Sequence, residues 1–81
     1  MTRPRVTLDP DTGYAYIYLA EPHPGIVENS IELEPTDDTD PEALRSLVLD
    51  FDPDGRLVGI EVTGPANRVL RAELLDDAEQ P

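Results

Sequence analysis

Residues 47–62 constrain the fold most, because they place a tight-turn signal between two runs of β-forming side chains. The turn residues are Asp52-Pro53-Asp54-Gly55. Pro53 presets one turn dihedral, and Gly55 supplies the positive φ of a type I turn that ends in a bulge. The flanking runs are rich in Leu, Val and Ile, which favour strands. The segment is therefore predicted to be a β-hairpin with Phe51 opposite Leu57.

This register predicts apolar side chains on both faces of the hairpin. One face would hold Leu47, Leu49, Phe51 and Leu57, and the other Val48, Val58, Ile60 and Val62. A sheet that is buried on both faces needs two covers. Residues 66–78 supply one cover, because Val69, Leu70, Leu74 and Leu75 recur at helical spacing. We expect a second copy of the chain to supply the other.

The remaining chain adds short strands separated by turns. Alternating side chains predict strands within 6–8, 14–19 and 27–33, and Pro and Gly mark the connections 9–13 and 21–25. We expect 34–43 to be an exposed acidic loop and 76–81 a flexible tail. The predicted fold is a single α+β domain over residues 1–81. It is an antiparallel β-meander of four to five strands with one C-terminal helix packed on one face.

Charge and composition limit the partners of the chain. Eighteen acidic against six basic residues give a net charge of −12, which repels nucleic acid and anionic lipid. Such a surface attracts a basic protein or a cation, although its most common role is to keep a domain soluble. No apolar run approaches the roughly 20 residues of a membrane helix, so a cytoplasmic location is expected. With no Cys and a single His, the chain cannot form disulfides or a metal site with several His or Cys ligands. Oligomerisation, most simply a homodimer, is then the expected way to stabilise a small core.

One acidic stretch matches the spacing of a calcium-binding loop. The matching residues are Asp50, Asp52, Asp54, Gly55 and Glu61. That motif needs a helix on each side, whereas 57–62 is β-rich. In a hairpin Asp50 would point away from Asp52, and Glu61 would lie several residues along the opposite strand, so the carboxylates would not converge. We therefore predict no metal site and no cofactor. The four carboxylates Asp50, Asp52, Asp54 and Glu61 are only weak candidates for metal ligands.

Three tyrosines are the other distinctive feature. Tyr14, Tyr16 and Tyr18 alternate along one strand and therefore share one face. Such a stripe suits a core, a homodimer seam or an interaction surface for another protein. No Ser, His or carboxylate pattern forms a catalytic constellation, so we predict that the chain is not an enzyme.

Two segments resemble a known family. They are Leu8-Asp9-Pro10-Asp11-Thr12-Gly13-Tyr14-Ala15-Tyr16-Ile17-Tyr18-Leu19 and Val48-Leu49-Asp50-Phe51-Asp52-Pro53-Asp54-Gly55-Arg56-Leu57-Val58-Gly59-Ile60-Glu61-Val62. They are similar to the small prokaryotic proteins called domain of unknown function 2283. The resemblance covers most of residues 6–70, although Gly13 stands where Asp is common and the loop 34–42 is longer. It implies a compact β-rich fold and no established activity, and it assigns no catalytic residue.

The sequence leads to three functional hypotheses. The first is a non-enzymatic protein-interaction module that self-associates, with Tyr14, Tyr16 and Tyr18 as candidate interaction residues. The second is an antitoxin-like or regulatory partner of a small basic protein, since some members of the resembled family are thought to be encoded beside toxin-like genes. The third is a weak divalent-cation binder at the segment from Asp50 to Glu61.

Overall fold

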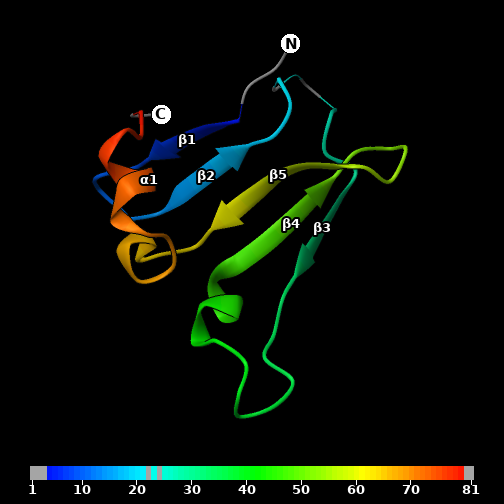
Figure 1. The fold of residues 1–81 in the computed structure, drawn as a ribbon. Helices are drawn as coiled ribbons and strands as arrows, with labels where there is room; N and C mark the ends of the chain where they lie inside the picture. The colour runs from blue at the N-terminus through cyan, green and yellow to red at the C-terminus, as the bar shows by residue number, and fades with distance from the viewer. Residues whose placement is uncertain (1–3, 22, 24, 80–81) are drawn as a thin grey trace.

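The computed structural model describes residues 4–21, 23 and 25–79. Its centre is a five-stranded antiparallel sheet in the order β1-β2-β5-β4-β3, with short helical segments against one face (Figure 1). The elements are β1 (Arg5–Leu8), β2 (Ala15–Tyr18), β3 (Asn29–Glu32), η1 (Glu42–Ser46), β4 (Leu47–Phe51), β5 (Leu57–Val62), η2 (Ala66–Arg68) and α1 (Ala72–Asp76). The predicted α+β class is confirmed, with five strands and a short C-terminal helix.

Local turn chemistry forms two of the hairpins. Between β1 and β2, the backbone oxygen of Asp9 accepts the N–H of Gly13 at 2.8 Å, and Gly13 takes a φ of 78°. Between β4 and β5, the Asp52 side chain accepts the N–H groups of Asp54 and Arg56 at 3.0 and 2.9 Å. Gly55 has a φ of 80° there, as the turn sequence predicts.

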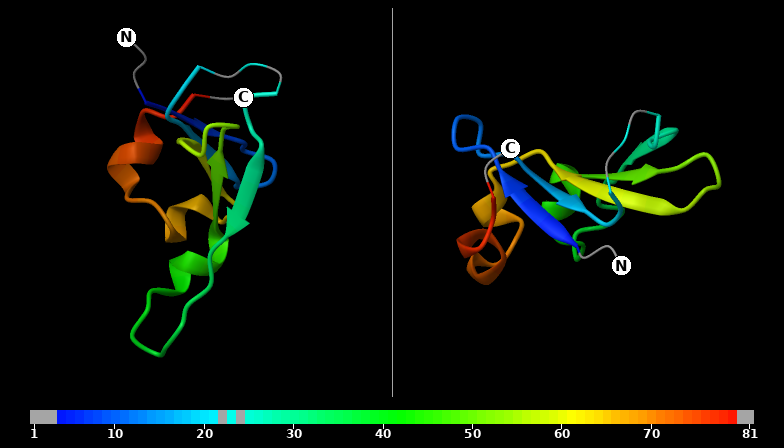
Figure 2. Two further views of the ribbon diagram at one scale, coloured as in Figure 1. Left: turned by 90° about the vertical axis from the view of Figure 1, so that its right-hand side faces the viewer. Right: turned by 90° about the horizontal axis from the view of Figure 1, so that it is seen from above.

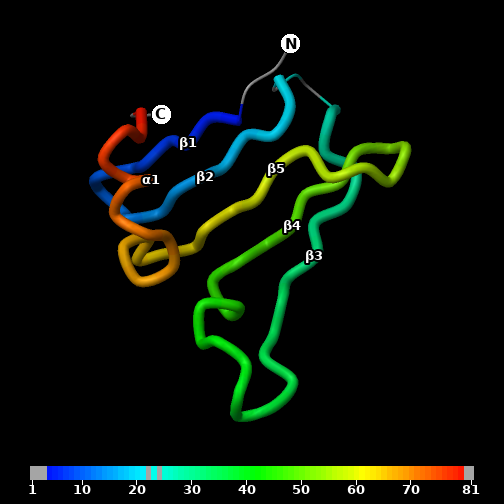
Figure 3. Tube along the Cα trace, in the orientation of Figure 1, coloured from blue at the N-terminus to red at the C-terminus, as the bar shows by residue number. Residues whose placement is uncertain are grey.

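The order of the strands puts β5 at the centre of the sheet. β5 pairs with β4 on one side and with β2 on the other, so it joins the two hairpins. After β2 the chain passes to the far edge and runs as β3 beside β4 (Figure 3). The two edge strands are therefore β1 and β3.

The C-terminal residues cover one of these edges. The N–H of Leu8 donates to the backbone oxygen of Glu79 at 2.7 Å, and the N–H of Glu79 donates to that of Val6 at 2.9 Å. Within the predicted flexible tail 76–81, Glu79 is bonded to β1, and residues 80–81 lie outside the described residues. Unpaired backbone groups at the sheet edge explain why Glu79 is held.

A bulge in β5 corrects the predicted faces of the hairpin. Phe51 pairs with Leu57 as predicted, but the next pair is Asp50 with Gly59, so Val58 is an extra residue in β5. An insertion of one residue moves all later side chains to the opposite face. Ile60 and Val62 therefore share a face with Leu49 and Leu47, and the sheet has one apolar face where the sequence predicted two.

The core lies on this apolar face, under the C-terminal segment. Ala15, Val62 and Ala66 are buried, and the side chains around them are Leu8, Leu47, Val69, Leu70 and Leu75. The predicted continuous helix over 66–78 is instead two short pieces, because Arg71 between them is extended with ψ of 151°. As a result, the helical cover is small and lies over one end of the sheet (Figure 2).

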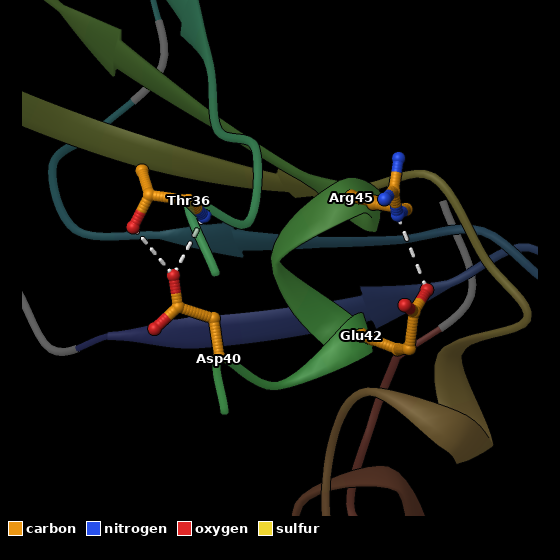
Figure 4. Close-up of polar contacts among 4 residues, drawn as sticks. All are labelled: Thr36, Asp40, Glu42 and Arg45. Atoms are coloured by element: carbon orange, nitrogen blue, oxygen red, sulfur yellow. Dashed lines mark hydrogen bonds and ion pairs between the residues drawn. The ribbon is translucent and has the colours of Figure 1, made fainter. Parts of the chain in front are cut away.

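The acidic segment after β3 is folded by its own side chains. The Asp40 carboxylate accepts the N–H and hydroxyl of Thr36 at 2.7 and 2.8 Å, and Arg45 donates to Glu42 at 3.2 Å within η1 (Figure 4). Hydrogen bonds to Thr36 lower the pKa of Asp40 below its ordinary value. Most residues of 34–43 are exposed. None of the described helices has the length and apolar character needed to cross a membrane.

Candidate functional site

The polar face of the sheet carries a hydrogen-bonded group of four side chains, which we call the Asp50 cluster: Tyr16, Ser30, Asp50 and Glu61. The Tyr16 hydroxyl donates to Asp50 Oδ2 at 2.6 Å, and the Ser30 hydroxyl donates to Oδ1 at 2.7 Å. Glu61 is hydrogen-bonded to the same carboxylate. One side chain each from β2, β3, β4 and β5 contributes, so the cluster ties four strands together.

Burial controls the protonation of the cluster. Asp50 is only 3% exposed, although it is an acidic residue. Burial, a hydrogen bond to Asp50 and the charge of that residue raise the pKa of Glu61 above its ordinary value of 4.5. Burial and the same neighbour also raise the pKa of Tyr16. The Tyr16 hydroxyl therefore stays neutral and donates to the Asp50 carboxylate, and the raised pKa of Glu61 favours its protonated form, which can donate to the same carboxylate.

Gly59 makes room for the cluster. Tyr16 lies on β2 and Asp50 on β4, with β5 between them, so the tyrosine ring must cross β5 to reach the carboxylate. A Cβ atom at Gly59 would lie 2.1 Å from Tyr16 Oη and 2.5 Å from its Cζ. The missing side chain is what allows this close approach.

The three tyrosines occupy different environments. The Tyr16 and Tyr18 ring centroids are 4.6 Å apart, and the Arg5 guanidinium carbon lies 4.9 Å from the Tyr18 ring centroid. Tyr14 precedes β2, is 51% exposed, and lies so close to Gly64 that a Cβ there would approach its Cδ1 to 2.7 Å. Tyr16 and Tyr18 thus make intramolecular contacts, and Tyr14 is the most exposed of the three.

The residues of the calcium-like spacing separate into two groups. Asp50 and Glu61 meet in the cluster, which corrects the expectation that a hairpin keeps them apart; the bulge at Val58 places both on one face. Asp52 instead accepts a hydrogen bond from the backbone of the β4–β5 turn. Asp54 lies in the same turn and is exposed. Within the described part of the chain, no three His, Cys, Asp or Glu side chains are grouped to hold a metal ion.

Beside the cluster lies a small hollow of about 190 Å³. Its lining residues are Tyr16, Tyr18, Ala20, Ile26, Val27 and Val58. The lining is mainly apolar, and among the described residues its polar side-chain groups are the two phenol hydroxyls. It is smaller than the pockets of about 300 Å³ or more that usually hold small molecules.

The opposite face carries a feature that the sequence did not single out by residue. Cross-strand partners form one line of apolar side chains through all five strands: Val6, Ile17, Ile60, Leu49 and Ile31. We call this line the open apolar row. None of the five belongs to the buried core cluster, and Ile31 is 49% exposed. The β5 bulge creates this row, so a register drawn without the bulge could not reveal it.

The sequence of the chain also places it in a protein family. The model of the family described as "Protein of unknown function (DUF2283)" matches residues 5–64. The chain therefore belongs to this family, as the two quoted segments indicated. The match covers all five strands and ends before η2. No curated protein and no solved structure matches the chain.

Proposed function

We propose that the chain is a non-enzymatic, cytoplasmic protein-interaction module that self-associates through the open apolar row. The observation that supports this proposal is the continuity of the row across all five strands beside a core that covers only the adjacent end of the same face. A line of Val, Ile and Leu that remains in contact with water favours association, because burial of apolar surface contributes about 25 cal/mol per Å².

A second copy suits this surface because the row contains no charged residue. Elsewhere the net charge of −12 makes two copies repel each other. Salt screens that repulsion and leaves apolar burial largely intact. Self-association through the row should therefore strengthen as ionic strength rises, whereas binding to a basic partner should weaken.

Sedimentation across a wide range of concentrations, at low and high salt, tests the proposal. The informative variant is Ile31→Asp, because Ile31 is 49% exposed on an edge strand and its replacement leaves the core intact. Val27→Asp is the matched control: Val27 is 41% exposed and lines the hollow on the opposite face. We expect only Ile31→Asp to reduce association. A chain that stays monomeric throughout, or equal effects of the two variants, would refute self-association through this row.

The excess of acidic side chains favours a second function. A regulatory or antitoxin-like partner of a small basic protein would use the negative surface for fast, salt-sensitive binding. Co-purification of the chain with a basic protein encoded beside it, lost at high salt, would support this function. Recovery of the chain alone at low salt would contradict it.

A further inference from the structure

The outer edge of β3 is the uncovered edge of the sheet. At the other edge, β1 is bonded to Glu79, whereas β3 pairs with β4 alone. All four residues of Asn29–Glu32 are exposed. In the left panel of Figure 2, β3 faces the viewer and no described segment crosses in front of it. An open strand edge offers backbone N–H and C=O groups to an added strand.

The alternation of backbone groups identifies which residues face outward. The N–H of Leu33 donates to the backbone oxygen of Leu47 at 3.1 Å, so that residue points toward β4. In an antiparallel pair, alternate residues direct their backbone groups to opposite sides. Glu32 and Ser30 therefore direct theirs toward solvent, where a further strand would pair.

The side chains along this edge are acidic on one face and apolar on the other. Ser30 bonds to Asp50, which places Ser30 on the polar face, and alternation puts Glu32 on the same face. Glu28 precedes β3, and its N–H donates to the backbone oxygen of Phe51 at 2.7 Å. Neither glutamate takes part in an ion pair with any described residue. On the opposite face, Ile31 ends the open apolar row.

We infer that the outer edge of β3 binds an extended strand of a basic partner in which Arg or Lys alternates with apolar residues. Side chains directly opposite on adjacent strands lie about 5 Å apart, so one basic residue would pair with Glu32. A second basic residue would lie near Glu28, just before β3. The apolar residues would extend the open apolar row beyond Ile31. The edge available from 29 to 33 is about 17 Å long at the usual rise per residue.

The same charges argue against a second copy at this edge. Two β3 strands pairing side by side would bring glutamates of like charge together, which destabilises a cross-strand pair. The inference thus concerns the backbone edge of β3, which meets the open apolar row only at Ile31, and it does not depend on self-association. It does rest on the proposal of a basic partner, for which it names the binding mode.

A synthetic peptide of about eight residues, in which Arg and Val alternate, is the probe. Calorimetry would measure its binding to the whole chain at low salt, and amide hydrogen exchange would locate it. We expect protection of the Ser30 and Glu32 amides, because their N–H groups acquire partners. The same peptide with every backbone nitrogen methylated keeps its charge but donates no backbone hydrogen bond, and we expect it not to bind.

Charge reversal tests the role of the two glutamates. The double variant Glu28→Lys/Glu32→Lys should weaken binding of the Arg-Val peptide about tenfold or more, and should favour a Glu-Val peptide instead. Asp76→Lys/Asp77→Lys is the control, because it makes the same change in net charge at exposed residues of the C-terminal segment. Both double variants are compared at about 0.15 M salt, where the effect of the control should be about twofold or less, since charges beyond about 8 Å are largely screened.

Three results would overturn the inference: no binding at millimolar peptide, equal weakening by both double variants, or binding of the methylated peptide. A basic protein that co-purifies with the chain but is unaffected by Glu28→Lys/Glu32→Lys would leave the basic partner in place and reject this binding mode. Sedimentation of the chain alone reports separately on the open apolar row.

Discussion

The hydroxyl of Tyr16 donates a hydrogen bond of 2.6 Å to the carboxylate of Asp50 across an intervening strand. The ring passes over Gly59 to make this contact, and the carboxylate it reaches is almost wholly buried. A buried carboxylate is tolerated only where hydrogen-bond donors surround it, and Tyr16 and Ser30 fill that role here. The contacts on the polar face therefore depend on one another, and substitutions that remove them should change the free energy of unfolding.

Removing the Tyr16 hydroxyl should destabilise the fold. Tyr16→Phe deletes a hydrogen bond to a charged, buried acceptor, so we expect the free energy of unfolding to fall by about 1.5–3 kcal/mol. Tyr14→Phe is the control, because Tyr14 is 51% exposed, and its effect should be within about 0.5 kcal/mol. Urea denaturation measures both; equal losses would contradict a special role for the Tyr16 hydroxyl.

Filling the space at Gly59 should displace Tyr16. We expect Gly59→Ala to cost about 1–3 kcal/mol, because its Cβ would lie 2.1 Å from Tyr16 Oη. Gly59 has no positive φ, so steric conflict alone causes the loss. In a Tyr16→Ala background the same substitution should cost clearly less. A double-mutant cycle with no coupling would show that the two residues do not meet.

The raised pKa of Glu61 gives stability a defined pH dependence. A group whose pKa is higher in the folded than in the unfolded chain contributes stability below its unfolded pKa and loses it as pH rises through its folded pKa. Between the ordinary value of 4.5 and the raised value, wild-type stability should therefore fall relative to Glu61→Gln. Melting temperatures of both proteins from pH 4 to pH 8 would test this. Parallel curves would contradict a protonated Glu61 in the fold.

The β4–β5 turn depends on one of its two acidic side chains. Asp52 accepts the N–H groups of Asp54 and Arg56, so Asp52→Ala should lower the free energy of unfolding by about 1–2 kcal/mol. Asp54 is exposed and contributes its backbone N–H to this network, so Asp54→Ala should change stability by about 0.5 kcal/mol or less. Thermal unfolding in chelator-treated buffer separates this effect from metal binding. Equal effects would mean that Asp52 does not organise the turn.

Features set by local chemistry could be predicted from the sequence. Gly13 and Gly55 adopt the positive φ that their turns require, and alternating side chains formed the strands expected around them. The pairing of Phe51 with Leu57 followed from the turn alone. The C-terminal helix was predicted too long, because helical spacing does not show where Arg71 becomes extended.

The candidate site depended on contacts between distant residues. A single extra residue at Val58 decided that Glu61 joins Asp50 on the polar face and that Ile60 joins the open apolar row. The alternation of side chains in 57–62 does not reveal this extra residue, because apolar side chains share a face of the hairpin both with and without the bulge. Tyr16 and Asp50 are 34 positions apart, and only the central position of β5 brings them together. Turn preferences act within a few residues and are therefore determined by the sequence itself. Strand order and bulge position depend on pairing between residues far apart in the sequence, so only the tertiary structure decided them.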